Sequence, residues 1–225
     1  MKKLSLLKKI RLAFMADGWL IKLLVMVYPL FMFLLIFDDE SGFFRGMGMF
    51  CYSVLMVSMS FVYMSTVMGN MKLYRVMPMR NTDIVDVATI HSLLGVMLIS
   101  LPNIVLLPFG GKADMLPYFL CMDCVMLAVT TAAVIWYAKD KYAGAQAKNI
   151  NDDEAEVKKH TRRVAVTAVT GMLLESTAGF LILLQAMSPD PKGDMPWLIA
   201  VSALGIIAYG VICIAARKIK NAFIY

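Results

Sequence analysis

Charged residues are scarce in this chain, and their scarcity argues against a soluble fold. Asp, Glu, Lys and Arg together make up 17% of the 225 residues, whereas a soluble domain carries about 25%. Hydrophobic residues make up 60%, and the mean hydropathy is +0.71. This composition leaves no room for a soluble catalytic domain.

Histidine and cysteine, which serve most often in catalysis and metal binding, are also few. The chain has two His and four Cys, and every cysteine falls in an apolar stretch, so none is placed for a disulfide in an exposed loop. Cys121 and Cys124 form a C-x-x-C, which in an apolar helix is more typical of packing than of redox or metal chemistry. His91 with Asp123 or Glu175 matches no known spacing for metal or acid–base chemistry. We therefore expect no enzymatic activity and no metal site.

A phosphate-binding loop is missing as well. The pattern G-x-x-x-x-G-K-[ST] occurs nowhere in the sequence, so the chain lacks the usual means of binding ATP. We expect no cofactor in this chain. Any ATP and magnesium that drive it would have to be bound by another polypeptide.

What the sequence does contain is a series of six apolar stretches. Each is close to the 20 residues or so that a helix needs to cross about 30 Å of hydrocarbon. In lipid, backbone polar groups must be paired within the segment, which favours helices. The sequence therefore predicts an all-α membrane protein with a single transmembrane domain over residues 1–225. Its six predicted transmembrane helices cover residues 19–37, 46–69, 84–108, 116–137, 164–187 and 195–216.

Basic residues are sorted between the two sides of these predicted spans. Of the 22 Lys and Arg residues, only Arg45, Lys112 and Lys192 fall in the outer connections, and Lys22 lies at the start of the first span. Because positive charge marks the cytoplasmic side, both termini are predicted to be cytoplasmic in a multi-pass protein of the cell (plasma) membrane. The net charge of +6 is thus concentrated on the predicted cytoplasmic side of a membrane. We therefore do not interpret it as a nucleic-acid-binding surface and expect no nucleic-acid partner.

The first 18 residues have the pattern of an interfacial helix lying on the bilayer. Their apolar and basic side chains separate onto different helical faces. The alternative is a basic anchor without a separate helix. No small-residue cleavage site precedes Asp38, so we expect this segment to stay attached. The apolar face holds Leu6, Leu7, Ile10, Ala13 and Phe14, whereas Ser5, Lys8, Lys9 and Arg11 lie elsewhere.

The charged segment 138–163 is predicted to form a helix that runs into the fifth span. Its acids precede its bases at helical spacing, as in the pairs Glu154–Lys158 and Glu156–His160. The alternative is a solvated charged face without further use.

Residues 71–83 connect the second and third spans. Pro78 ends or kinks what precedes it. Asn81, Thr82 and Asp83 can cap a helix that begins at Ile84. The sequence predicts a short, stiff elbow at the cytoplasmic side.

This elbow resembles the loop between the second and third spans in permease subunits of the type-two ABC (ATP-binding-cassette) exporter family. Those loops carry a Leu-Pro-Val-Ser-Arg-like run followed by Ile-Val. Here Met77-Pro78-Met79-Arg80 and Ile84-Val85 match, with Met in place of Leu and Val. The family's Lys a few residues later is absent, since Asp86-Val87-Ala88 follow.

The resemblance implies a coupling helix that sits in a groove of a separate nucleotide-binding subunit. It also implies a second permease subunit, identical or related. The alternative is an ordinary short loop. The residues implied to couple to the ATPase are Met77, Pro78, Met79, Arg80, Asn81, Thr82, Asp83, Ile84 and Val85.

Two acids lie well inside the predicted spans. Asp123 and Glu175 are costly in lipid, so each is expected to face the bundle interior or a cavity. One interpretation places them on a translocation path for a cationic or amphipathic substrate. The other has them protonated or paired between packed helices. His91 is expected near the membrane interface.

Taken with the resemblance, these patterns predict an exporter permease that moves an amphipathic or hydrophobic substrate, such as a peptide. One alternative is the substrate-capturing membrane subunit of a vitamin importer. A second is a non-transporting membrane protein, such as an immunity or scaffold factor.

Overall fold

The computed structural model describes residues 4–15, 80–150, 154–186 and 191–218. Within these ranges the regular structure is helical throughout and contains no strand. The predicted spans 19–37 and 46–69 lie outside the described residues.

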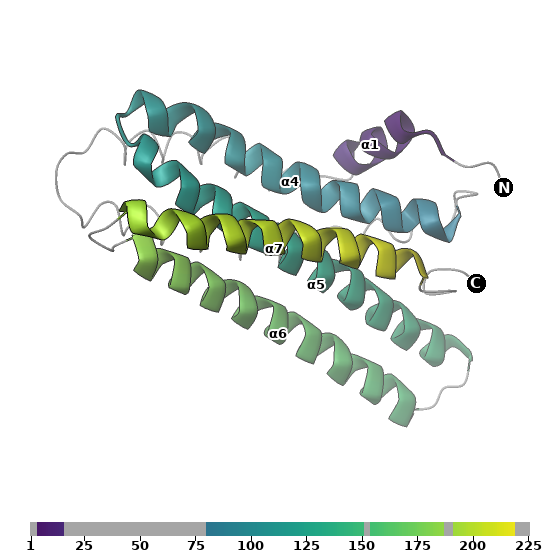
Figure 1. Cartoon of the computed structure of the whole chain (residues 1–225). Helices are drawn as coiled ribbons and strands as arrows, with labels where there is room; N and C mark the ends of the chain where they lie inside the picture. Colours follow the sequence, from purple (N-terminus) through teal and green to yellow (C-terminus); the bar gives the residue numbers. More distant parts are fainter. Residues whose placement is uncertain (1–3, 16–79, 151–153, 187–190, 219–225) are drawn as a thin grey trace.

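The long helices of the described part run alternately in opposite directions, and the short helix α1 packs beside the beginning of α4 (Figure 1). The beginning of α4, the end of α7, and α1 lie at the same end of the bundle (Figure 1). The elements are α1 (Leu6–Met15), α4 (Asn81–Phe109), the 3-10 helix η1 (Ala113–Met115), α5 (Leu116–Ile150), α6 (Glu154–Ala186) and α7 (Pro191–Lys218).

Four segments in the described part are long and apolar enough to cross a membrane. Their positions agree with the predicted spans 84–108, 116–137, 164–187 and 195–216. The chain is therefore a helical, membrane-embedded protein, whereas six spans and cytoplasmic termini stay predictions. The segments are Thr82–Phe109, Ala113–Trp136, Val157–Ile182 and Gly193–Lys218.

Helix α5 is the centre of the bundle, because it packs against α4, α6 and α7. In its most apolar window 67% of the residues are buried, against 22% in α6 and 11% in α7. Both outer helices thus expose long rows of large apolar side chains, among them Leu173 and Leu181 on α6 and Ile199 and Ile207 on α7. Apolar side chains turned outward on this scale suit a hydrocarbon surrounding better than water.

One face of α7 makes its contacts with the bundle. Seven residues on it recur every three or four positions, which is the spacing of one helical stripe. At Gly205 the two helix backbones touch: a Cβ there would lie 2.7 Å from the carbonyl carbon and oxygen of Cys124 on α5. The stripe is Asp194, Leu198, Val201, Gly205, Tyr209, Ile212 and Ala216.

A tight turn joins α4 to α5. The N–H groups of Gly110 and Lys112 donate to the carbonyls of Leu106 and Leu107, both at 2.9 Å. Gly111 has a φ of 70°, a left-handed conformation that glycine adopts at little steric cost.

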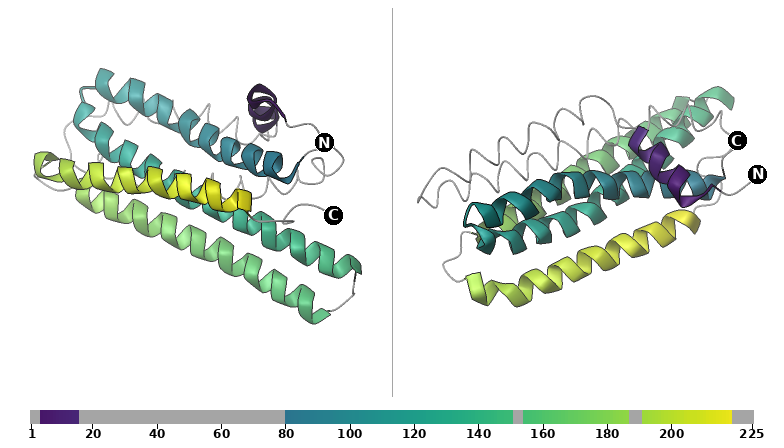
Figure 2. Two further views of the ribbon diagram at one scale, coloured as in Figure 1. Left: turned by 45° about the vertical axis from the view of Figure 1, so that its right-hand side comes forward. Right: turned by 90° about the horizontal axis from the view of Figure 1, so that it is seen from above.

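Helices α5 and α6 continue past the ends of α4 and α7, as the left view of Figure 2 shows. At 1.5 Å per residue the 35 residues of α5 extend about 52 Å, well beyond one hydrocarbon layer. Helix α6 begins at Glu154, so residues 154–163 form a charged helix that runs into the fifth span, as predicted. The earlier part of the segment, up to Ile150, belongs to α5 instead.

Candidate functional site

The most strongly charged buried contact joins α1 to the first turns of α4. The Nζ atom of Lys9 lies 2.7 Å from Oδ1 of Asp83 and 2.5 Å from Oδ2 of Asp86. The side chains of Lys9 and Asp83 are 5% and 0% exposed. Asp83 and Asp86 lie three residues apart on one face of α4, so a single ammonium reaches both.

Helix α7 reaches the same place with its last turn. Nη2 and Nε of Arg217 each lie 2.6 Å from Oδ1 of Asp86. About two turns earlier in α7, the hydroxyl of Tyr209 donates to the carbonyl of Thr89 at 3.3 Å. A cavity of about 460 Å³ lies between these groups and α1, with Lys9, Asp86 and Arg217 in its lining. We call Lys9, Asp83, Asp86 and Arg217 the ionic cluster.

Two further hydrogen bonds hold α1 against α4. The N–H of Leu4 donates to Oδ2 of Asp83 at 3.3 Å. Nδ1 of His91 donates to the carbonyl of Ala13 at 3.0 Å, which is one of the carbonyls at the helix end that have no partner inside α1. His91 thus lies against α1, the helix predicted to be interfacial.

Two acids face two bases in the ionic cluster, so its formal charge is balanced. Burial alone would lower the pKa of Lys9, but hydrogen bonds to Asp83 and Asp86 and their negative charges outweigh it and raise that pKa. Lys9 therefore stays protonated while α1 is seated.

The structure corrects one expectation for this region. Helix α4 begins at Asn81 with Arg80 as its N-cap and no side-chain capping bond, so the prediction that Asn81, Thr82 and Asp83 cap a helix starting at Ile84 is wrong. The carbonyl of Arg80 already accepts from the N–H groups of Asp83 and Ile84, while the Asp83 carboxylate binds Lys9.

Lys9 is buried although its neighbour Lys8 is exposed. Two carboxylates from a distant part of the chain draw it into the bundle.

The predicted coupling residues divide into three groups. Met77, Pro78 and Met79 lie outside the described residues, and of Asn81 only the helical backbone is described. Arg80 and Thr82 are exposed, whereas Asp83, Ile84 and Val85 are buried within the chain. Among the described side chains of this group, those of Arg80 and Thr82 are therefore the exposed ones.

The intramembrane acids are both buried in the bundle. Glu175 on α6 is 0% exposed and accepts a hydrogen bond from Oγ1 of Thr130 on α5 at 2.9 Å. Asp123 is 6% exposed and precedes Thr130 by seven residues, so the two share a face of α5 about 10 Å apart along its axis. For Glu175 this contact agrees with the interpretation of pairing between packed helices.

Asp194 is a buried acid that the sequence reasoning missed. At the opposite end of the bundle it accepts from the hydroxyl of Tyr118 at 2.9 Å and from Nε2 of Gln185. It thereby joins the start of α7 to α5 and α6. The available signal was a lone acid in the first turn of an apolar helix, where the helix dipole favours negative charge.

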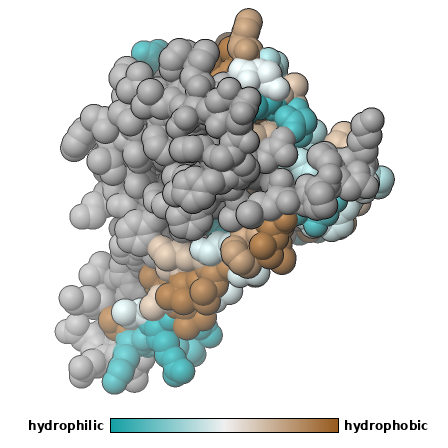
Figure 3. Space-filling view, turned by 90° about the vertical axis from the view of Figure 1, so that its left-hand side faces the viewer, coloured by the Kyte–Doolittle hydropathy of each residue, from teal (hydrophilic) through white to brown (hydrophobic). Residues whose placement is uncertain are grey.

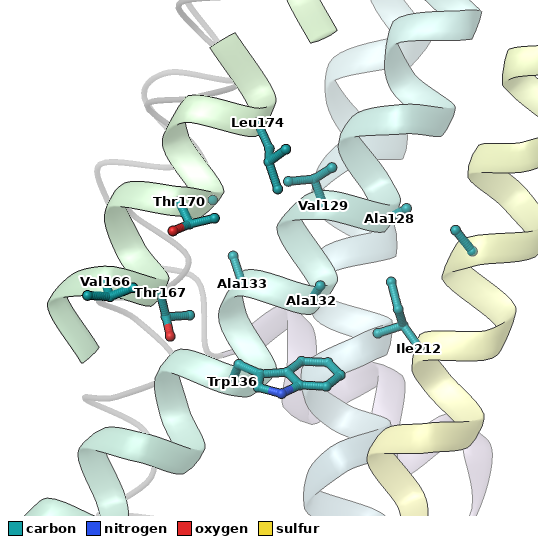
Figure 4. Close-up of a pocket in the computed structure, with 12 residues that line it drawn as sticks. Ala128, Val129, Ala132, Ala133, Trp136, Val166, Thr167, Thr170, Leu174 and Ile212 are labelled. Carbon is teal, nitrogen blue, oxygen red and sulfur yellow. The ribbon is translucent and has the colours of Figure 1, made fainter. Parts of the chain in front are cut away.

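An apolar groove of about 490 Å³ runs between α5, α6 and α7. Small side chains such as Ala132 and Ala208 leave this space, with Trp136 at one end and Leu174 toward the other (Figure 4). A groove lined almost entirely by carbon suits a hydrocarbon chain rather than a polar ligand.

Metal chemistry finds no support in the part of the chain that the structure describes, where no group of three His, Cys, Asp or Glu side chains could hold an ion. Cys121, Cys124 and Cys213 are free thiols. No protein-family model, curated protein or solved structure matches this chain.

Proposed function

We propose that this chain is the membrane-spanning permease subunit of an ABC exporter that moves an amphipathic or hydrophobic substrate, such as a peptide. Separate ATPase subunits would bind ATP and magnesium, and a second permease subunit would complete the pathway. Residues 77–85 would serve as the coupling helix. The support comes from the sequence resemblance, the sorted basic residues and the apolar helices.

One observation carries the proposal: the exposed elbow end is fastened to two other helices. Arg80 and Thr82 face outward, and directly behind them Asp83 and Asp86 bind Lys9 of α1 and Arg217 of α7. A push on the start of α4 would therefore move α1 and α7 with it. This is the rigid-body coupling that an attached motor requires.

Photo-crosslinking tests the proposal directly. A benzophenone amino acid placed at Thr82 should form adducts with a nucleotide hydrolase in native membranes, identified by mass spectrometry. The matched control is Phe109, which is 86% exposed at the other end of the same helix and should form no such adduct. Hydrolase adducts at neither position, or equally at both, would contradict the proposal.

The consequence for transport is tested with Arg80→Glu. Reversing the charge at the exposed elbow should abolish substrate movement while ATP hydrolysis by the copurified complex continues. Asp83 is unsuitable for this purpose, because its buried carboxylate also seats α1. Unchanged transport by Arg80→Glu would reject the coupling role, and copurification without any hydrolase would favour the vitamin-capturing or scaffold alternatives.

A further inference from the structure

The groove between α5, α6 and α7 continues toward a basic surface. On α6 its lining includes Thr167, Thr170 and Leu174, which follow one another at helical spacing. Arg163 lies four residues before Thr167, and Arg162 lies four residues before Val166. Residues four apart lie on the same face of a helix. The basic side chains and the groove therefore share one side of α6.

These basic residues are exposed and have no acid among them. Lys158, Lys159, Arg162 and Arg163 all lie exposed within two turns of α6. In Figure 3 the lowest part of the molecule, where α6 begins, is hydrophilic, and hydrophobic surface adjoins it above. Positive charge thus stands directly beside an apolar surface, as at a boundary between headgroups and hydrocarbon.

Trp136 marks the same boundary on α5. It lies at the end of the groove nearest Val166 and Thr167 (Figure 4), and Val166 and Thr167 are the lining residues nearest the arginines in α6. Tryptophan concentrates at the membrane interface, because its ring is apolar and its N–H is polar. The groove would then lie in the hydrocarbon and the arginines among the headgroups.

We propose that this groove binds an anionic phospholipid, with one acyl chain between α5, α6 and α7 and the phosphate held by Arg162 and Arg163. The apolar lining suits the chain, and guanidinium groups bind phosphate through paired, charge-assisted hydrogen bonds. Zwitterionic lipids would enter the same groove less well, since their headgroups carry no net negative charge. This site does not depend on the proposed transport function.

Tryptophan quenching by brominated lipids tests the site. The chain has three Trp, so a Trp19→Phe/Trp197→Phe variant leaves Trp136 as the sole fluorophore. In vesicles that mix unlabelled lipid with brominated phosphatidylglycerol or brominated phosphatidylcholine, binding is measured from the loss of Trp136 emission. Since one basic residue near an anionic surface contributes about five-fold in affinity, we expect a preference of roughly 5- to 25-fold for phosphatidylglycerol.

Two further variants locate the site. Arg162→Gln/Arg163→Gln should reduce the preference to about one-fold, because the headgroup loses its partners. Ala132→Phe should block the groove and weaken quenching by both lipids, with folding checked by size-exclusion chromatography and circular dichroism. Trp136→Phe/Trp19→Phe leaves Trp197, at the other end of the bundle, and should report no preference.

Three results would overturn the proposal. They are equal quenching of Trp136 by both lipids, a preference that survives Arg162→Gln/Arg163→Gln, and an equal preference reported by Trp197. The last would show only a general attraction of anionic lipid to a basic protein.

Discussion

At the scale of single residues, Lys9 shows most clearly how charge is used here. A lysine is rarely buried unless it is paired, and the attraction must offset the cost of removing it from water. Asp83 and Asp86 supply that attraction from α4. The sequence after the elbow reads Asp86-Val87-Ala88 and contains no Lys. The positive charges next to Asp86 are those of Lys9 and Arg217, from two other helices.

Removing the Lys9 ammonium should be costly. Lys9→Met leaves a buried carboxylate without its cation, so we expect a loss of about 3 kcal/mol and a melting temperature lower by roughly 6–12 °C. The measurement is a thermal melt of the detergent-purified protein followed by size-exclusion chromatography. Lys8→Met, next to it on the exposed side of α1, should melt within about 2 °C of the parent.

The same lysine predicts a dependence on pH. Its pKa is raised above the ordinary value of 10.5 in the folded chain, so the folded state holds the proton more tightly than the unfolded state. The stabilisation is therefore complete below that ordinary value and is lost as the pH rises through the folded pKa.

Above neutral pH, we expect proteolysis near α1 to accelerate only in that alkaline range. Lys9→Met should be sensitive already at neutral pH and show no alkaline transition of its own. A parent protein that releases α1 on mild alkalinisation, well below the ordinary pKa of 10.5, would contradict this assignment.

At the scale of elements, the apolar length of each segment was enough to locate α4, α5, α6 and α7. The ends were less predictable. The predicted span ends at residue 137, but the helix α5 continues to Ile150. Hydropathy indicates which residues lie in the membrane and does not predict how far the helix extends beyond it. The N-cap of α4 was misjudged because Asp83, a good capping residue in isolation, is bound by Lys9.

The ionic cluster could not be predicted from spacing along the sequence. Lys9 and Asp86 are 77 positions apart in the sequence. The spacing of residues within one helix does not predict which charged residue of another helix will lie against that helix. The burial of Glu175 and Asp123, by contrast, followed from the cost of charge in lipid, and both are buried.

Helix contact at Gly205 gives a prediction at the element scale. A methyl group there would collide with the backbone of Cys124, so Gly205→Ala should destabilise the α5–α7 pair by about 1–3 kcal/mol. Gly210 lies on the same helix with no atom within 4 Å of an added Cβ. Gly210→Ala should be neutral or slightly stabilising, because alanine favours helix more than glycine does.

Melting of the two alanine variants in detergent measures the difference. Equal melting temperatures for Gly205→Ala and Gly210→Ala would mean that α5 and α7 do not approach as closely as the structure shows.

At the scale of the whole molecule, the ionic cluster and the Asp194 contacts lie at the two ends, whereas the middle holds buried polar side chains such as Asp123 and Glu175 among apolar ones. The ionic cluster ties α1, α4 and α7 at one end, and Asp194 ties α5, α6 and α7 at the other. Between them, Glu175 and Thr130 link α5 to α6. This distribution suits a chain whose middle lies in hydrocarbon, where each unpaired polar group is costly.

Helix α7 is fastened to α5 at two heights, through Asp194 and Gly205, and to α4 at a third, through Arg217. A rod held in this way cannot slide along its neighbour without breaking a charged or close contact at one of them. We therefore expect α5 and α7 to keep a constant separation through any change of state. The distance between spin labels on α5 and α7 would therefore serve as a fixed reference when distances to other helices are measured in different states.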